Sequence, residues 1–219
     1  MIVYLATKAE YRAVILSNQT EKILDSFQGI LGKSVGECEL AVWRNSLPYM
    51  DRVLDDPDIP HDTGVAIEFT IHQTGKRIDI ILTGIHQDRQ RTAVIVGLKQ
   101  WQKAEVIRKD AIVTTFVGGR EREVNHPSYQ AWAYAMLIED FNETVRLDPM
   151  HLRPCAYLHK CEFRSVIHAP FYAKHTKAAP AFLKDDARKL RAFIKAHVKY
   201  GDKGETMYRS FKGNTRMVA

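Results

Sequence analysis

The chain has 219 residues, of which 45% are hydrophobic and 26% are charged, an ordinary composition for a globular protein with one sizeable core. No apolar run approaches the roughly 20 residues that span a bilayer, and no basic segment followed by a long apolar one stands at the amino terminus. These features exclude a membrane-spanning class, and we expect one cytoplasmic domain with a C-terminal extension. Three cysteines without a C-x-x-C pair argue against a disulfide framework and against structural zinc.

Positive charge is concentrated in the C-terminal third of the chain. The formal net charge is +6, and residues 151–219 hold 15 of the 32 Lys and Arg but only 5 of the 26 Asp and Glu. Clustered positive charge attracts nucleic acid in a salt-dependent way. A solvated helix face is the alternative interpretation, and composition favours neither.

Residues 1–55 are predicted to be mostly helical. Apolar residues recur at helical spacing from Thr20 to Leu31 and from Ser34 to Leu54, with a break or kink at Pro48. We expect these helices to cover one face of a sheet. A turn-rich connector with two prolines, residues 55–63, then leads to the first predicted strand.

Three alternating segments predict three neighbouring strands, at 65–71, 77–83 and 93–100. A turn signal at 74–76 joins the first two. Side chains two apart in a strand point the same way, so Gly97 and Lys99 share a face. Pairing of the strands would gather on one surface Glu68, Asp79, Gly97 and Lys99. The apolar residues expected on the opposite face are Val65, Ile67, Phe69 and Ile71 in the first strand and Ile78, Ile80 and Leu82 in the second.

The second half of the chain continues with a strand at 112–117, a hairpin turn at Gly118-Gly119, and a helix that starts near Pro127 and runs to about Val145. Gln130 and Tyr134 lie four apart on this helix and share a face. A final strand is predicted at 152–159.

Beyond Phe163, aromatic residues alternate with cations, and a helix capped by Asp185 or Asp186 is predicted to reach about Tyr200. Residues 206–219 are expected to form a tail. The nine histidines show no H-x-x-x-H pair, so none is proposed as a zinc ligand. The cations expected to contact nucleic-acid phosphates are Lys174, Lys177, Lys184, Arg188, Lys189, Arg191 and Lys195.

The strand residues resemble the motif of the PD-(D/E)xK nuclease superfamily, an acid on one strand followed by an acid-x-Lys triplet on the next. Asp79 matches the first acid, and Gly97-Leu98-Lys99 occupies the triplet, with glycine in place of its acid. Gln130 and Tyr134 match the Gln-x-x-x-Tyr signature of RecB-like members. The resemblance implies an α/β fold with a restriction-endonuclease-like αβββαβ core and a central mixed sheet, N-terminal helices and a basic C-terminal helical extension.

Longer stretches are similar to the nuclease-like region that precedes a Schlafen-type DNA/RNA helicase module in bacterial proteins. The similarity covers most of residues 1–205 and is carried by KSVGECELAVWRNSL, GVAIEF, KRIDIILTG, GLKQW, HPSYQAWAYAMLIEDFNETV and PCAYLHK. It implies a single domain with a helical part at 1–55, a catalytic core at 64–160 and a basic extension at 163–201. An ATP-dependent helicase module is the implied partner.

The function implied is a Mg²⁺- or Mn²⁺-dependent nuclease acting on DNA, with RNA as a second candidate substrate. Glu68, Asp79 and the Leu98 carbonyl would hold the metal, Lys99 would position or activate water, and Gln130 and Tyr134 would support the site. Gly97 offers no side chain to a metal, so hydrolysis is expected to be impaired. The alternative is a non-catalytic nucleic-acid-binding module that works with a helicase.

Two residues have structural interpretations of their own. Asp79 would alternatively be an exposed strand acid paired with Lys99 or Arg77. Gly97 would alternatively mark a close approach of two backbones or a bulge.

Overall fold

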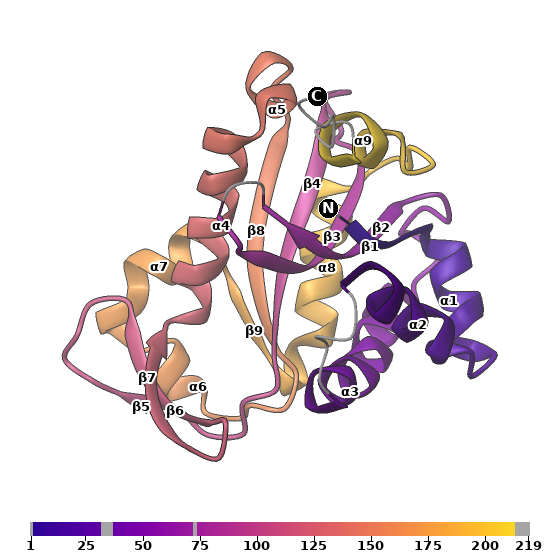
Figure 1. Ribbon diagram of the computed structural model, residues 1–219. Coiled ribbons are helices and arrows are strands. Elements are labelled where there is room, and N and C mark those ends of the chain that lie inside the picture. The colour runs from indigo at the N-terminus through magenta and orange to yellow at the C-terminus, as the bar shows by residue number, and fades with distance from the viewer. Residues whose placement is uncertain (1, 32–36, 72–73, 213–219) are drawn as a thin grey trace.

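The computed structural model describes residues 2–31, 37–71 and 74–212, which form a mixed α/β fold around one six-stranded sheet (Figure 1). The strand order is β1-β2-β3-β4-β8-β9; the first four strands are antiparallel neighbours, and β4, β8 and β9 run parallel. The strands are β1 (Ile2–Thr7), β2 (Gly64–Thr70), β3 (Arg77–Ile85), β4 (Arg91–Lys99), β8 (His151–Leu158) and β9 (Ala181–Leu183).

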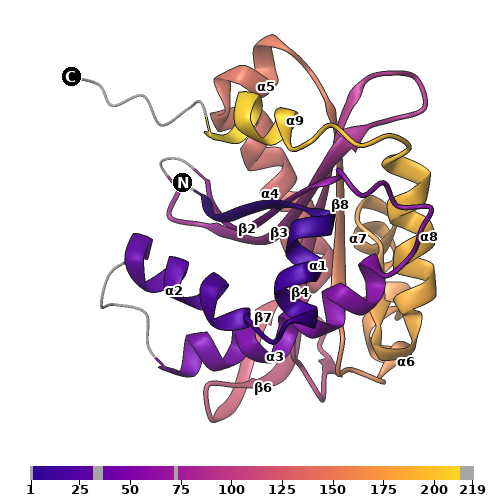
Figure 2. The same ribbon diagram turned by 90° about the vertical axis from the view of Figure 1, so that its right-hand side faces the viewer.

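Helices cover both faces of this sheet (Figure 2). One apolar cluster joins strand residues to α1 (Lys8–Leu16), α2 (Thr20–Leu31), α3 (Glu37–Leu54) and α8 (Ala187–His197). The other cluster joins the opposite side to α4 (Pro127–Phe141), α5 (Glu143–Leu147), α9 (Glu205–Met207) and the π-helical turn η4 (Tyr208–Lys212). None of the helices in the described residues combines the length and apolar character that a bilayer span requires.

A smaller three-stranded sheet lies between β4 and α4 in the chain and stands apart from the central sheet (Figure 1). It packs in a third apolar cluster with the segment that follows β8, where the Tyr172 hydroxyl donates to the Ile112 carbonyl at 2.6 Å. Its strands are β5 (Glu105–Val106), β6 (Ile112–Val117) and β7 (Arg120–Asn125); the neighbouring segment holds α6 (Arg164–Ile167), η2 (Pro170–Tyr172), α7 (Ala173–Ala178) and η3 (Lys184–Asp186).

The predicted central elements are confirmed with small shifts. The strands β2, β3, β4 and β8 begin and end within two residues of the predicted bounds, and β6 and α2 match theirs. The helix predicted from Ser34 is described from Glu37 onward, and residues 32–36 of that prediction lie outside the described residues. Helix α4 stops at Phe141 because Asn142 leaves the helical conformation and caps α5, its side-chain oxygen accepting from the Val145 amide at 3.1 Å.

Three predicted segments differ from the structure. Within residues 1–55, β1 is an edge strand, and Thr7 ends it by capping α1. Within 163–201, β9 extends the central sheet, so this segment is integrated into the fold rather than appended to it, and α8 ends at His197. Residues 206–212 are not a tail, because Met207 and Phe211 are buried in the core; 213–219 lie outside the described residues.

The alternation of buried residues changes side at Glu68. Val65 and Ile67 pack with α3, as predicted, but Phe69, Ile71 and Ile78 pack in the cluster that contains α4 and η4. Phe69 makes an edge contact with Phe211, with the ring centroids 5.2 Å apart. The prediction that all these apolar residues share one face is therefore wrong beyond Glu68. Glu68 has φ +54° and makes no strand pair with β1 or β3, but the register of both pairings is the same on either side of it.

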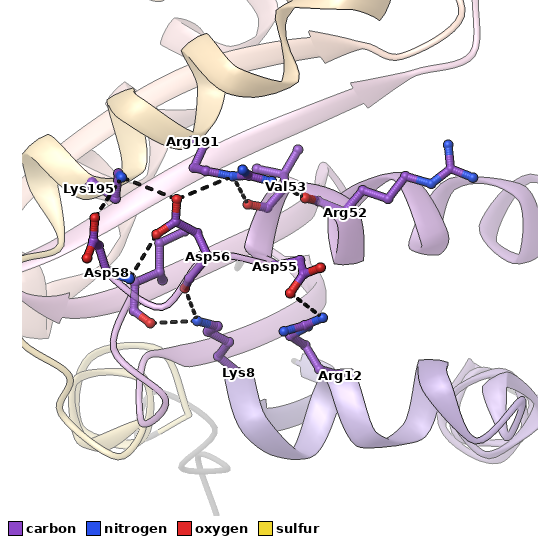
Figure 3. A network of polar contacts seen from close by, with 10 residues as sticks. Lys8, Arg12, Arg52, Val53, Asp55, Asp56, Asp58, Arg191 and Lys195 are labelled. Carbon is purple, nitrogen blue, oxygen red and sulfur yellow. Dashed lines mark hydrogen bonds and ion pairs between the residues drawn. The ribbon is translucent and has the colours of Figure 1, made fainter.

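The connector before β2 is anchored by a buried lysine. The ammonium of Lys8, 1% exposed, donates to the carbonyl oxygens of Asp56 and Ile59, each at 2.6 Å (Figure 3). These bonds satisfy a charge that burial would otherwise make costly. They place the start of β2 against α1.

His126 caps α4 in a form that only a neutral imidazole can provide. Its Nδ1 accepts from the Ser128 amide at 3.3 Å, so Nε2 carries the proton and donates to the Ile167 carbonyl at 3.0 Å. Burial lowers the pKa of His126 to about 4. Protonation would put a second donor against the Ser128 amide and break the cap.

We expect the free energy of unfolding to fall as the pH is lowered from about 6.5 toward 4. In this window an unfolded histidine, with a pKa of about 6.5, binds a proton that folded His126 does not, so stability rises with pH. His126→Asn, which keeps a capping oxygen but cannot titrate, should flatten this dependence in urea melts at several pH values. The pH dependence that remains in the His126→Asn protein should come from His159 and His197, because burial also lowers their pKa values to about 4.

The control is the parent protein melted in urea at the same pH values. An unchanged slope in the His126→Asn protein would show that the cap is not pH-sensitive.

Candidate functional site

The predicted strand and helix residues converge on one open cavity of about 270 Å³ on the α4 side of the sheet. Strands β2, β3 and β4 supply its floor, α4 supplies one wall, and the β2–β3 turn supplies the rim. The cavity is lined by Glu68, Gly75, Lys76, Arg77, Ile78, Asp79, Ile95, Gly97, Lys99, Gln130, Ala131 and Tyr134.

Glu68 is held in the left-handed backbone region, with φ +54°. This conformation is uncommon for a residue with a side chain and is strained by roughly 1–3 kcal/mol. The side chain is 5% exposed, and its Oε2 lies 3.4 Å from Arg77 Nη1. The strained residue is thus one that presents a carboxylate to the cavity.

Asp79 stands where β3 and β4 separate. Their last paired residues are Ile80 and Val96, and beyond them Asp79 Oδ2 accepts the Leu98 amide at 2.6 Å. Lys99 Nζ lies 3.9 Å from the same oxygen. Burial raises the pKa of Asp79, while Lys99 and the Leu98 bond oppose that rise. The pairing of Asp79 with Lys99 therefore occurs inside the cavity, not on an open strand surface.

Gly97 is not required by the backbone. Its φ is not in the left-handed region, and a Cβ built on it would meet one atom within 4 Å, the Cys155 carbonyl oxygen at 3.9 Å, an ordinary contact. Close backbone approach therefore does not explain this glycine. A longer side chain at position 97 would enter the cavity beside Asp79 and Lys99.

Helix α4 contributes a bonded pair. Gln130 Nε2 donates to the Tyr134 hydroxyl at 2.9 Å, and both side chains line the cavity. Burial raises the pKa of Tyr134, and the Asp79 carboxylate adds to the rise. The hydroxyl therefore stays protonated at neutral pH. The structure gives Leu98 a contact through its amide, and the metal-binding role of its carbonyl stays a prediction.

Two cations at the rim, Lys76 and Arg77, were not among the predicted phosphate contacts. Lys76 lies in the turn between the strands that carry Glu68 and Asp79, and Arg77 is the first residue of the second strand. Their position next to the acidic motif in the sequence was the available signal. Together with Lys99 they place three cations beside the two carboxylates that line this cavity.

Most of the cations predicted to bind phosphate are instead paired within the protein. Ion pairs join Lys174 to Asp110, Lys184 to Glu162, Lys189 to Asp186, Arg191 to Asp56, and Lys195 to Asp56 and Asp58. Figure 3 shows the last group, in which Arg191 also donates to the carbonyls of Arg52 and Val53. Asp56 and Asp58 were predicted in the connector and Asp186 as a possible helix cap, but sequence alone did not place these acids beside the cations.

Two of the predicted cations, Lys177 and Arg188, are exposed and make no ion pair with any residue in the described ranges. Lys177 lies on α7, which packs against α4 and so lies on the cavity side of the sheet (Figure 1). Arg188 lies on α8, which packs with α3 on the other side. The basic third of the chain is thus divided between both faces.

A scan against protein-family models and searches of curated proteins and of solved structures found no match to this chain. The site therefore rests on its own geometry.

The strain at Glu68 is testable through stability. At an ordinary strand position, a protein with glycine is less stable than the same protein with alanine by roughly 0.5–1 kcal/mol. In a left-handed backbone conformation, alanine destabilises the protein by about 1–2 kcal/mol, a cost that glycine avoids. We expect the order to reverse at position 68, with Glu68→Gly more stable than Glu68→Ala by about 1 kcal/mol in urea melts.

Glu121 on β7 is the matched control, since it is an exposed strand residue outside the left-handed region. There Glu121→Gly should be less stable than Glu121→Ala. The same order at both positions would contradict the assigned strain.

Proposed function

We propose that this chain is a PD-(D/E)xK-type nuclease-like domain that binds nucleic acid and whose phosphodiester hydrolysis is impaired by Gly97. The observation that carries the proposal is the convergence of Glu68, Asp79, Gly97 and Lys99 on one cavity, in the order that the motif requires. The order of elements supports it, since α3, β2, β3, β4, α4 and β8 occur in the order of an αβββαβ core, with β5, β6 and β7 inserted before α4 and α5 inserted before β8. The Gln130–Tyr134 pair on the cavity wall adds a further match.

The residues present do not fit a catalytic Mg²⁺ or Mn²⁺ site. Such ions take about six oxygen ligands, commonly with several carboxylates and waters. Here Glu68 faces Arg77, one Asp79 oxygen is engaged by the Leu98 amide, and Gly97 supplies no side chain. Because both carboxylates already have partners in the protein, too few free oxygens remain to hold an ion in the position that in-line attack requires. We assign no hydrolytic step to this chain as it stands.

What the present residues do is bind and orient a phosphate backbone. Lys99 inside the cavity and Lys76 at its rim supply positive charge for phosphate oxygens. Arg77 pairs with the Glu68 carboxylate and so reduces its repulsion of the phosphates. The buried Asp79 fixes the Leu98 amide and so the position of Lys99. DNA is the substrate class that the family resemblance favours, with RNA as the alternative.

The second candidate function is a non-catalytic binding module that holds nucleic acid for an ATP-dependent helicase module. Gly97 favours it, because a module that never cleaves needs no acid there. The retained Asp79, Lys99, Gln130 and Tyr134 favour an impaired nuclease. The two proposals differ in what one substitution at position 97 would do.

Gly97→Glu should confer metal-dependent cleavage. The added carboxylate would lie on the face of Lys99 and beside Asp79, completing an oxygen donor set, and the cavity has room for it. Nicking of supercoiled plasmid and trimming of linear DNA and of RNA should appear with Mg²⁺ or Mn²⁺ and vanish with chelator. Gly97→Gln, equal in size but uncharged, should remain inactive.

Adding Asp79→Ala or Lys99→Ala to the Gly97→Glu protein should return cleavage to the level of the chain as given. If the Gly97→Glu protein is folded, binds Mn²⁺ and stays inert on every substrate, the enzyme proposal is lost and the binding module stands.

Binding should fall steeply with added salt, because phosphate contacts release counterions. Lys76→Gln should weaken binding of labelled single- and double-stranded DNA and RNA, and lower the slope of log K against log salt by about 0.9 on duplex DNA. Lys195→Gln, at a cation already paired with Asp56 and Asp58, should change the slope little. Binding that is absent at low salt, or independent of salt, would overturn the proposed nucleic-acid function.

A further inference from the structure

A second group of potential metal ligands lies at the opposite end of β3 from the cavity. His86 follows the last residue of β3, Asp88 lies in the turn to β4, and His151 begins β8. The parallel pairing of β4 and β8 places Thr92 opposite His151 and so brings the start of β8 to this turn. These three residues are therefore assembled by the sheet, across 65 positions of sequence.

The geometry of the group is compact. His86 Nδ1 lies 3.0 Å from Asp88 Oδ1, and His151 Nε2 lies 2.8 Å from Asp88 Oδ2. The three ligand atoms lie within 4.8 Å of one another. Ligands of a tetrahedral ion bound at about 2.0–2.1 Å stand about 3.3–3.5 Å apart, so small side-chain rotations suffice to surround one.

The backbone holds the carboxylate in place. The turn is closed by the His86 amide donating to the Gln90 carbonyl at 2.8 Å, and the Gln90 amide donates to Asp88 Oδ1 at 3.0 Å. Arg89 takes a left-handed conformation, φ +67°, which fixes the direction of the turn. The side chains of His86, Asp88 and His151 are 23%, 44% and 25% exposed, so one side of the group is open to solvent.

We propose that His86, Asp88 and His151 form a binding site for a divalent transition-metal ion of the Zn²⁺ type. Two imidazole nitrogens and one carboxylate oxygen form a donor set that such ions prefer, and the open side leaves a fourth position for water. Mg²⁺ prefers oxygen ligands alone and should not compete. This site is independent of the cavity and of its proposed function.

The Arg153 guanidinium should weaken metal binding at His151. Replacing Arg153 should therefore strengthen binding, whereas replacing a ligand should weaken it. Arg153 Nη2 lies 3.4 Å from His151 Nδ1. Metal binding at Nε2 moves the imidazole proton to Nδ1, where it would face the guanidinium donor. Replacing Arg153 with glutamine removes the positive charge and supplies an oxygen that can accept this proton, as supporting groups around metal-bound histidines do.

The bound ion would connect the β3–β4 turn to the start of β8. It would therefore stabilise the folded state increasingly as the free ion concentration rises above the Kd, because the unfolded chain does not hold the three ligands together.

The test uses the full chain, stripped with chelator and titrated with Zn²⁺, Co²⁺ and Mg²⁺ separately. We expect about one Zn²⁺ per chain by metal analysis after gel filtration, a Co²⁺ absorption spectrum typical of nitrogen and oxygen ligands, and a melting temperature raised by Zn²⁺ but not by Mg²⁺. His86→Ala with His151→Ala should weaken Zn²⁺ binding by at least about tenfold and abolish the thermal shift. Arg153→Gln should bind Zn²⁺ more tightly.

The control is His61→Ala with His168→Ala, which removes two exposed imidazoles elsewhere and should bind Zn²⁺ as the parent does. Asp88→Asn keeps the bond to the Gln90 amide and covers the case in which the double variant fails to fold. Zn²⁺ binding that is equal in the parent, Asp88→Asn and His86→Ala/His151→Ala proteins would overturn the proposal, as would weaker binding by Arg153→Gln.

Discussion

The separation of β3 from β4 is the constraint on which the candidate site depends. Backbone pairing of these strands ends at Ile80 and Val96, and from there the Asp79 carboxylate accepts the Leu98 amide in place of a backbone carbonyl. Because a side chain now spans the gap, the strands diverge and the α4 face opens into a cavity. The same carboxylate is buried by this arrangement, which makes the charge of Lys99 important for keeping it ionised. Glu68 reaches the cavity through a strained backbone, which the paired strands on either side maintain.

Most of the cations that were predicted to contact phosphate form ion pairs within the protein. Asp56 illustrates this: it receives Arg191 and Lys195 from α8 while its carbonyl accepts from Lys8 (Figure 3). Exposed pairs of this kind contribute little individually, but a network around a buried lysine fixes the connector that begins β2. The net charge of +6 therefore does not by itself locate a binding surface, and the proposed function rests on the cations that line the cavity.

The sequence could predict the parts of the fold that repeat a local pattern. Alternating residues located β2, β3, β4 and β8, although helices bury both faces of the first three, and the spacing of Gly97 and Lys99 placed both on one face. It could not reveal the left-handed Glu68, since nothing in its neighbours demands that conformation, and so the burial of Phe69 was assigned to the wrong side. Ion pairs and the His86–Asp88–His151 group join segments far apart in the chain, and only the sheet topology brings them together.

Strand β3 carries a donor set at each end, and the two differ in chemical character. The Asp79 carboxylate stands near the Arg77 end, whereas His86 follows Ile85 at the other end, roughly 23 Å from Asp79 along the strand at 3.3 Å per residue. The carboxylates at the first end do not complete a Mg²⁺ site without an acid at position 97, whereas the imidazoles at the second suit Zn²⁺-type ions. The strand between them is fully buried from Ile80 to Thr83, and the residues that line the cavity and the His86–Asp88–His151 group have no member in common. In the two proposals, the residue at position 97 governs hydrolysis, and the histidines govern attachment of the β3–β4 turn to β8.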